Sequence, residues 1–132
     1  MSEGPSLDLV ELPSPLPFQA TVERLTAAIT SAGMQIFAVV DHAALARGVG
    51  LALPPATVLI YGNPRGGTPL MLAAPQVALD LPLRVLIRER GDGVAVVTFR
   101  PVARMLAGSG LPAELTARLE PAQRLLVEAM EP

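Results

Sequence analysis

Residues 83–99 read LRVLIRERGDGVAVVTF, and this stretch decides the fold class. Two β-rich runs, 83–90 and 94–99, flank the turn Gly91-Asp92-Gly93, which is a strong hairpin signal. The hairpin favours an antiparallel sheet over a doubly wound parallel one. Its second run carries apolar side chains at both odd and even positions, so both faces of that strand must be covered.

The rest of the chain supplies the remaining strands and the helices around the hairpin. A short strand is expected within residues 7–12, and β-rich runs follow at 34–40 and 57–61. Residues 19–32 carry apolar side chains at helical spacing, with Gly33 as the stop. Shorter helices are expected over 42–48 and from Thr68, and a last helical stripe contains Leu115, Leu119, Leu126 and Met130, divided near Pro121.

These elements predict an α+β fold in which a long helix packs on one face of a four- or five-stranded antiparallel sheet. The 132 residues fit one domain. Residues 1–17 form an N-terminal strand and Pro-rich lead, 18–110 the core, and 111–132 a C-terminal helical segment of the same domain.

Composition excludes several classes of protein. The chain is 51% hydrophobic, its mean hydropathy is +0.47, and its ten basic residues, all Arg, are outnumbered by twelve acidic ones. Without a basic excess and with only 3% aromatic residues, nucleic-acid binding is not expected. Zero Cys excludes disulfides and thiolate metal sites. No uncharged stretch reaches the ~20 residues of a membrane span, and no basic segment precedes Arg24, so a cytoplasmic protein is expected.

The densest run of unusual residues joins the strand 57–61 to the next helix. A ligand-contacting loop here would use Asn63, Arg65, Gly66, Gly67 and Thr68, with Thr68 as helix cap and Pro69 in the first turn. Backbone N–H groups at a helix N-terminus together with an Arg side chain suit a small anion. The alternative is a tight turn before a Pro-started helix, and a nucleotide P-loop is disfavoured because Thr68 stands where that motif needs Lys.

Asp41 and His42 form the second candidate site, because they stand at a strand end and His42 is the only histidine. Asp41 could equally cap the helix that follows. Asp80, in an otherwise apolar run, would cap a turn, pair with an Arg or join the site. Because the chain has one His and no Cys, we expect no metal site. It also lacks the Gly-x-Ser-x-Gly motif that would support a hydrolase.

From about Gln19 to Gly108 the chain resembles the bacterial and archaeal family catalogued as domain of unknown function 302. The resemblance is carried by residues 21–25, 37–44, 62–71 (GNPRGGTPLM) and 79–86 (LDLPLRVL). It implies a β-α-β4-α order, similar to TATA-binding-protein-like domains, and a possible dimer. It brings no established reaction and leaves any cofactor unknown, so Asp41, His42, Asn63, Pro64, Thr68 and Asp80 are candidate site residues by location only.

Three functions remain open. The first is a homodimeric module that binds or senses a small ligand, for which an anion is one candidate. The second is an enzyme in which His42 is general acid or base, oriented by Asp41 or Asp80, while Asn63 polarises a carbonyl. The third is a pure interaction module. The dimer interface is expected around Val96 and Val97 or along the stripe of Leu119, Leu126 and Met130.

Overall fold

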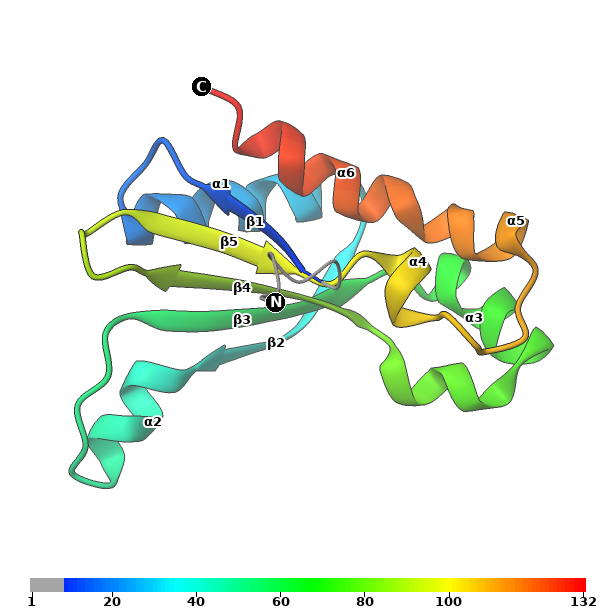
Figure 1. The fold of residues 1–132 in the computed structure, drawn as a ribbon, viewed down its shortest axis with the longest axis horizontal. Coiled ribbons are helices and arrows are strands. Elements are labelled where there is room, and N and C mark those ends of the chain that lie inside the picture. The colour runs from blue at the N-terminus through cyan, green and yellow to red at the C-terminus, as the bar shows by residue number, and fades with distance from the viewer. Residues whose placement is uncertain (1–8) are drawn as a thin grey trace, which may run out of the picture.

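A five-stranded antiparallel sheet, with strand order β1-β5-β4-β3-β2, organises the molecule (Figure 1). The structure, a computed structural model, describes residues 9–132. The strands are β1 (Val10–Pro13), β2 (Gln35–Asp41), β3 (Ala56–Gly62), β4 (Leu83–Glu89) and β5 (Ala95–Phe99). The predicted α+β class and the β-α-β4-α order are confirmed. Residues 7 and 8 of the predicted first strand lie outside the described residues.

Two helices, at residues 18–31 and 120–129, pack on one face of this sheet, several shorter ones lie past one of its ends, and the helix at residues 42–48 lies at the opposite end (Figure 1). The α-helices are α1 (Phe18–Ser31), α2 (His42–Gly48), α3 (Pro64–Ala73), α4 (Val102–Met105), α5 (Ala113–Thr116) and α6 (Glu120–Ala129). Two 3-10 helices, η1 (Pro75–Asp80) and η2 (Ala117–Leu119), complete the set. Within residues 9–132 no helix is both long and apolar enough to cross a membrane.

The hydrophobic core lies between the sheet and the layer formed by α1 and α6. Its members from the sheet include Leu59, Tyr61, Val85, Ile87, Val97 and Phe99, and from the helices Leu25, Ile29, Leu126 and Met130. All five residues of β5 are buried, as a strand that is apolar on both faces requires.

The core composition corrects the expected dimer interface. Val97 and Leu126 are completely buried inside this chain, and Val96, Leu119 and Met130 are buried as well. The helical stripe is used to hold α6 on the sheet, so it is not free for a second copy.

Two polar contacts fix α6 on its neighbours. Tyr61 Oη donates to the carbonyl of Ala122 at 2.8 Å. The buried amide of Gln123 donates to the Arg100 carbonyl at 2.7 Å and accepts from the Val102 N–H at 3.0 Å. Because each contact satisfies a backbone group that water cannot easily reach, both set the position of α6 as well as its stability.

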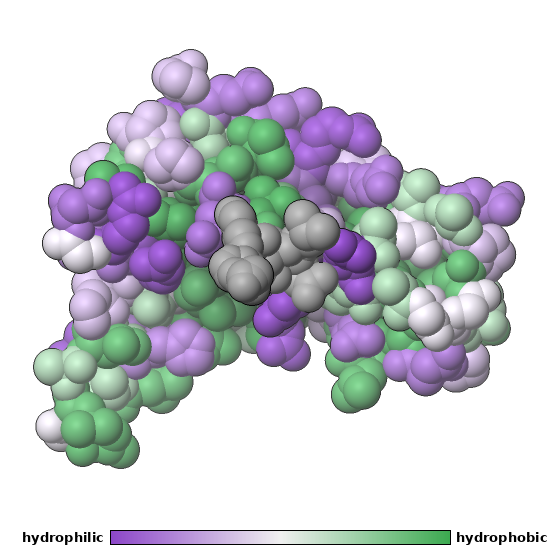
Figure 2. Space-filling model, in the orientation of Figure 1, coloured by the Kyte–Doolittle hydropathy of each residue, from purple (hydrophilic) through white to green (hydrophobic). Residues whose placement is uncertain are grey.

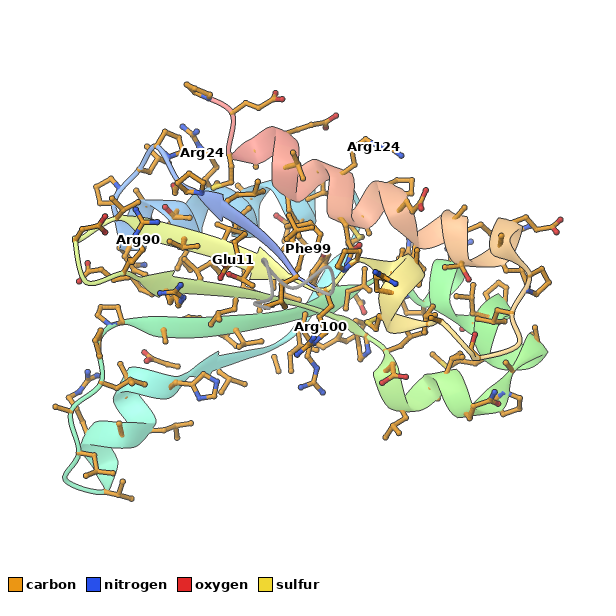
Figure 3. The ribbon with its side chains drawn as sticks, viewed as in Figure 1. Glu11, Arg24, Arg90, Phe99, Arg100 and Arg124 are labelled. Carbon is orange, nitrogen blue, oxygen red and sulfur yellow. The ribbon has the colours of Figure 1, made fainter. Side chains whose placement is uncertain are left out.

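The β4–β5 hairpin closes through its turn residues. Asp92 accepts from the Arg90 guanidinium at 2.8 Å and from the Val94 N–H at 3.1 Å. These hydrogen bonds, that of Arg90 foremost, lower the pKa of Asp92 to about 2. Arg90 lies at the end of the sheet away from α3 (Figure 3).

Candidate functional site

The segment after β3 is a helix from its first residues and not the predicted loop. Asn63 is the N-cap: its Oδ1 accepts from the Arg65 N–H at 2.9 Å, and Pro64 occupies the first helical position. The helix α3 therefore begins at Pro64, and the prediction that Thr68 caps it was wrong. Thr68 lies inside the helix.

The same geometry overturns the predicted backbone anion site. Pro64 has no N–H, Asn63 Oδ1 accepts from Arg65, and the N–H groups of Gly66 and Gly67 both donate to the Asn63 carbonyl at 2.9 and 3.0 Å. The first donors of α3 are thus used within the turn itself. Arg65 is solvent-exposed and does not line the cavity beside this helix.

That cavity, of about 410 Å³, is the main feature of this end of the sheet. Its walls come from the end of α1, the start of β2, the junction of β3 with α3, the cis Leu81-Pro82 turn, and the segment from η2 into α6. The lining is mostly apolar: Ala32, Met34, Phe37, Gly62, Pro64, Gly66, Gly67, Met71, Leu81, Pro82, Leu83, Leu119, Pro121, Ala122 and Leu125. Met34 and Met71 are flexible side chains that adapt to the shape of a ligand.

Three glycines keep one wall of the cavity bare. None of Gly62, Gly66 and Gly67 has a positive φ, so the backbone does not require glycine at these positions. A Cβ added at Gly66 would lie 3.8 Å from Leu119 Cδ2, and one at Gly67 would lie 3.6 Å from Met71 Cε, which are ordinary contacts. Glycine inside a helix costs up to ~1 kcal/mol relative to alanine. Neither conformation nor crowding explains that cost here; the three glycines leave this wall of the cavity open.

The polar lining residues are Asn63, Thr68 and Arg118, and all three are solvent-exposed. The polar groups of the cavity therefore stand at its opening. The lining includes no carboxylate. Of the predicted ligand-contacting residues, the structure brings Asn63, Gly66, Gly67 and Thr68 to one cavity, and places Arg65 and Asp80 outside it.

Asp41 and His42 lie at the opposite end of the sheet from Asn63. Asp41 pairs with Thr57 at the start of β3, whereas Gly62, beside Asn63, pairs with Gln35. The seven residues of β2 separate the two groups by about 20 Å at ~3.3 Å per residue. His42 and Asn63 therefore do not converge, as the alternative enzyme reading requires them to do.

Asp41 and His42 form the beginning of α2 at that end of the sheet. Asp41 Oδ1 accepts from the Ala44 N–H at 2.9 Å and caps α2, as the structural alternative predicted. His42, the first residue of α2, is solvent-exposed.

Asp80 is the last residue of η1 and is solvent-exposed. Its carboxylate forms no ion pair within 4 Å with any residue of the described range, so the expected Arg partner is absent there. It lines a separate depression with Arg84 and Arg100. Across residues 9–132, no three His, Cys, Asp or Glu side chains stand together in a way that could hold a metal ion.

Several cavity residues carry no sequence signal of their own. Phe37, Met34 and Leu125 read as ordinary core positions, and Arg118 reads as a solvated charge on a helical segment. Only the fold shows that α6 returns beside α3. Likewise, only the fold shows that the Leu81-Pro82 turn lies beside the glycines of residues 62–67.

Comparison with known proteins identifies the family. The family described as "Domain of unknown function DUF302" matches residues 10–131. The chain belongs to this family. The DUF302 protein from Bacillus stearothermophilus, solved as a crystal structure of an uncharacterized conserved protein, has the same fold, with a TM-score of 0.82. The likeness covers 95% of this chain and 97% of that one at 15% sequence identity.

Curated relatives are longer proteins. Over 78 residues, 59% of this chain, it is 46% identical to proteins named fluoride-specific ion channel from Brucella suis biovar 1 (strain 1330) and Brucella abortus biovar 1 (strain 9-941). The match covers 31% and 29% of those proteins. This DUF302 chain thus spans less than a third of the length of the curated relatives it matches.

Proposed function

We propose that this DUF302 domain is a small-molecule binding module and that its ligand occupies the cavity beside α3. The observation that carries the proposal is the glycine-lined apolar wall formed by Gly62, Gly66 and Gly67. The volume of about 410 Å³ lies within the ~300–1,000 Å³ of small-molecule sites, which are typically apolar with a few polar groups.

Occupancy of the cavity would be transmitted to the rest of the fold. The lining residues come from both α3 and α6, and Ala122 also accepts the hydrogen bond of the buried Tyr61. A ligand that touches both helices stabilises their present arrangement in proportion to its concentration. This coupling supports a sensing role, in which the position of α6 reports the bound state.

The longer relatives support a module that works beside a second region of the same protein. Their printed name concerns fluoride, but the cavity here favours an organic ligand. A buried small anion needs several converging donors, because desolvating a charge is costly. The donors at the start of α3 are already used, and the lining is largely apolar.

The test uses a neutral fluorescent probe, 1-aminonaphthalene, whose emission shifts when it leaves water. We expect it to bind the wild-type protein, and Gly66→Leu to weaken binding by roughly tenfold or more, since the new side chain fills the cavity. Gly91→Leu is the control, because Gly91 lies in the β4–β5 turn with open space around it and does not line the cavity. Failure of the probe to bind, or equal binding by both variants, would contradict the proposal.

The same module is proposed to act as a homodimer through β2 and α2. β2 is an edge strand of the sheet, and no Lys or Arg protects it from pairing. Large apolar side chains are exposed on this part of the chain, including Val39 at 60%, Leu45 at 62%, Val49 at 73% and Leu51 at 65%. Figure 2 shows apolar surface gathered over α2 and the loop that follows it. Apolar surface of this extent is typical of an interface.

A further inference from the structure

Arg118 is the only charged residue among those that line the cavity. It belongs to η2, directly before the start of α6, and its side chain is solvent-exposed. Within residues 9–132 it forms no ion pair within 4 Å, although Glu114 and Glu120 lie nearby in the sequence. The guanidinium therefore stands at the opening of the cavity with its donors available to a ligand.

The other two polar groups at the opening also supply donors. Asn63 uses its Oδ1 to cap α3, which leaves the amide NH₂ as the part of that side chain available to a ligand. The Thr68 hydroxyl can donate or accept. A guanidinium, an amide NH₂ and a hydroxyl together favour a head group that accepts hydrogen bonds and carries negative charge.

The remainder of the cavity suits a chain of carbon atoms. Met34, Phe37, Met71, Leu81 and Leu125 offer no polar side-chain group that would orient a second polar part of a ligand. If each heavy atom takes roughly 30 Å³, the share of one water molecule in the liquid, the cavity holds on the order of a dozen heavy atoms. That is the size of a ten-carbon carboxylate.

From these observations we infer that the cavity binds a medium-chain carboxylate, with the alkyl chain against the glycine wall and the carboxylate at Arg118. The inference rests on the proposed function and names the class of its ligand. A phosphate ester of the same length is a poorer fit, because a second negative charge would meet the single cation of the lining.

The experiment measures displacement of bound 1-aminonaphthalene by sodium decanoate and, separately, by 1-decanol. Three proteins are compared: wild type, Arg118→Gln and Arg124→Gln. Arg124 is the matched control, since it is an exposed arginine on α6 that does not line the cavity and points away from the sheet (Figure 3).

We expect Arg118→Gln to raise the half-displacing concentration of decanoate about five- to tenfold, and to leave that of 1-decanol within about twofold. Arg124→Gln should change neither value. Because the pair at the opening is exposed to solvent, added salt should weaken decanoate binding to the wild type and not 1-decanol binding.

The outcomes separate the two proposals. If 1-aminonaphthalene does not bind, the proposed function itself fails. If the probe binds but decanoate does not displace it, or if Arg118→Gln shifts decanoate and 1-decanol equally, the carboxylate inference is overturned while the cavity remains a binding site. A loss of decanoate affinity in Arg124→Gln as large as in Arg118→Gln would also overturn it, because it would indicate a general charge effect.

Discussion

Tyr61 links the sheet to the helical layer beside the cavity, because it lies on β3 and contacts α6. Its ring is completely buried, and its hydroxyl donates to the carbonyl of Ala122, which lines the cavity. Burial raises the pKa of Tyr61 well above its usual value near 10. The folded protein therefore keeps this phenol protonated at a pH where an unfolded chain would lose the proton.

Alkaline pH should consequently unfold the protein. Above about pH 10 the unfolded chain binds fewer protons than the folded one, so the free energy of unfolding falls as pH rises. Because Tyr61 is the only tyrosine and the chain has no Trp, tyrosinate absorbance reports this residue alone. The absorbance change should coincide with the loss of circular dichroism.

Tyr61→Phe is the companion variant. It leaves the Ala122 carbonyl without its donor, so we expect a loss of about 1–3 kcal/mol at neutral pH and a weaker dependence of stability on alkaline pH. Tyrosinate formation near pH 10 in a wild-type protein that stays folded would contradict this account.

Residue-level sequence analysis succeeded where a role is local and failed where it depends on the fold. The Asp41 cap depends only on positions 41–44 of the chain, and it is present. Whether His42 and Asn63 can share one site depends on which ends of the sheet they occupy, and the sequence alone does not show this. Successive antiparallel strands end at opposite ends of the sheet. His42 follows β2 and Asn63 follows β3, so the length of a strand separates the two residues.

At the scale of elements, α3 shows how competing caps are resolved. Both Asn63-Pro64 and Thr68-Pro69 offer a capping side chain followed by proline, and sequence analysis favoured the second because it read the glycine-containing residues 62–67 as a loop. The helix begins at the first instead, directly after β3. Packing against η1 and the C-terminal helices outweighs the unfavourable glycines.

The glycines of α3 should therefore be replaceable at a functional cost. We expect Gly66→Ala to raise the free energy of unfolding by about 0.5–1 kcal/mol, because alanine restricts the unfolded chain and meets only ordinary contacts. Thermal unfolding measures the gain. The same variant should bind 1-aminonaphthalene more weakly than the wild type.

Gly48→Ala tests whether the two effects separate. Gly48 also has an ordinary φ and open surroundings, but it lies at the end of α2, far from the cavity. It should gain stability to a similar or smaller extent without loss of probe binding. A destabilised Gly66→Ala would show that the glycine has a structural role and not a role in keeping the cavity open.

At the scale of the whole molecule, the proposed homodimer uses the exposed apolar surface of β2 and α2. We expect light scattering to give twice the 13.8 kDa of one chain at micromolar concentration. Val39→Glu should produce a folded monomer, since Val39 is 60% exposed and central in the edge strand. Leu79→Glu, at a position 86% exposed in η1, is the control and should remain dimeric.

A wild-type mass near that of one chain across the dilution series would exclude the dimer. Substitutions at Val97 or Leu126 cannot test it, because both side chains belong to the core of a single chain. The fold class was predictable from the β-rich runs around the hairpin turn and from apolar residues at helical spacing. The exposed apolar surface of β2 and α2 was not predictable, since exposure at β2 depends on the strand order.

The pairing of the first strand with the last one has a consequence for how the protein is made. Val10 of β1 pairs with Phe99 of β5, which is 99 − 10 = 89 positions later in the chain. At roughly 5–20 residues per second of translation, β1 waits on the order of ten seconds for its partner to be synthesised. During that interval its apolar residues, Val10 and Leu12, have no β5 to pack beside. A nascent chain stalled before β5 would thus leave β1 unpaired and accessible to chaperones and proteases.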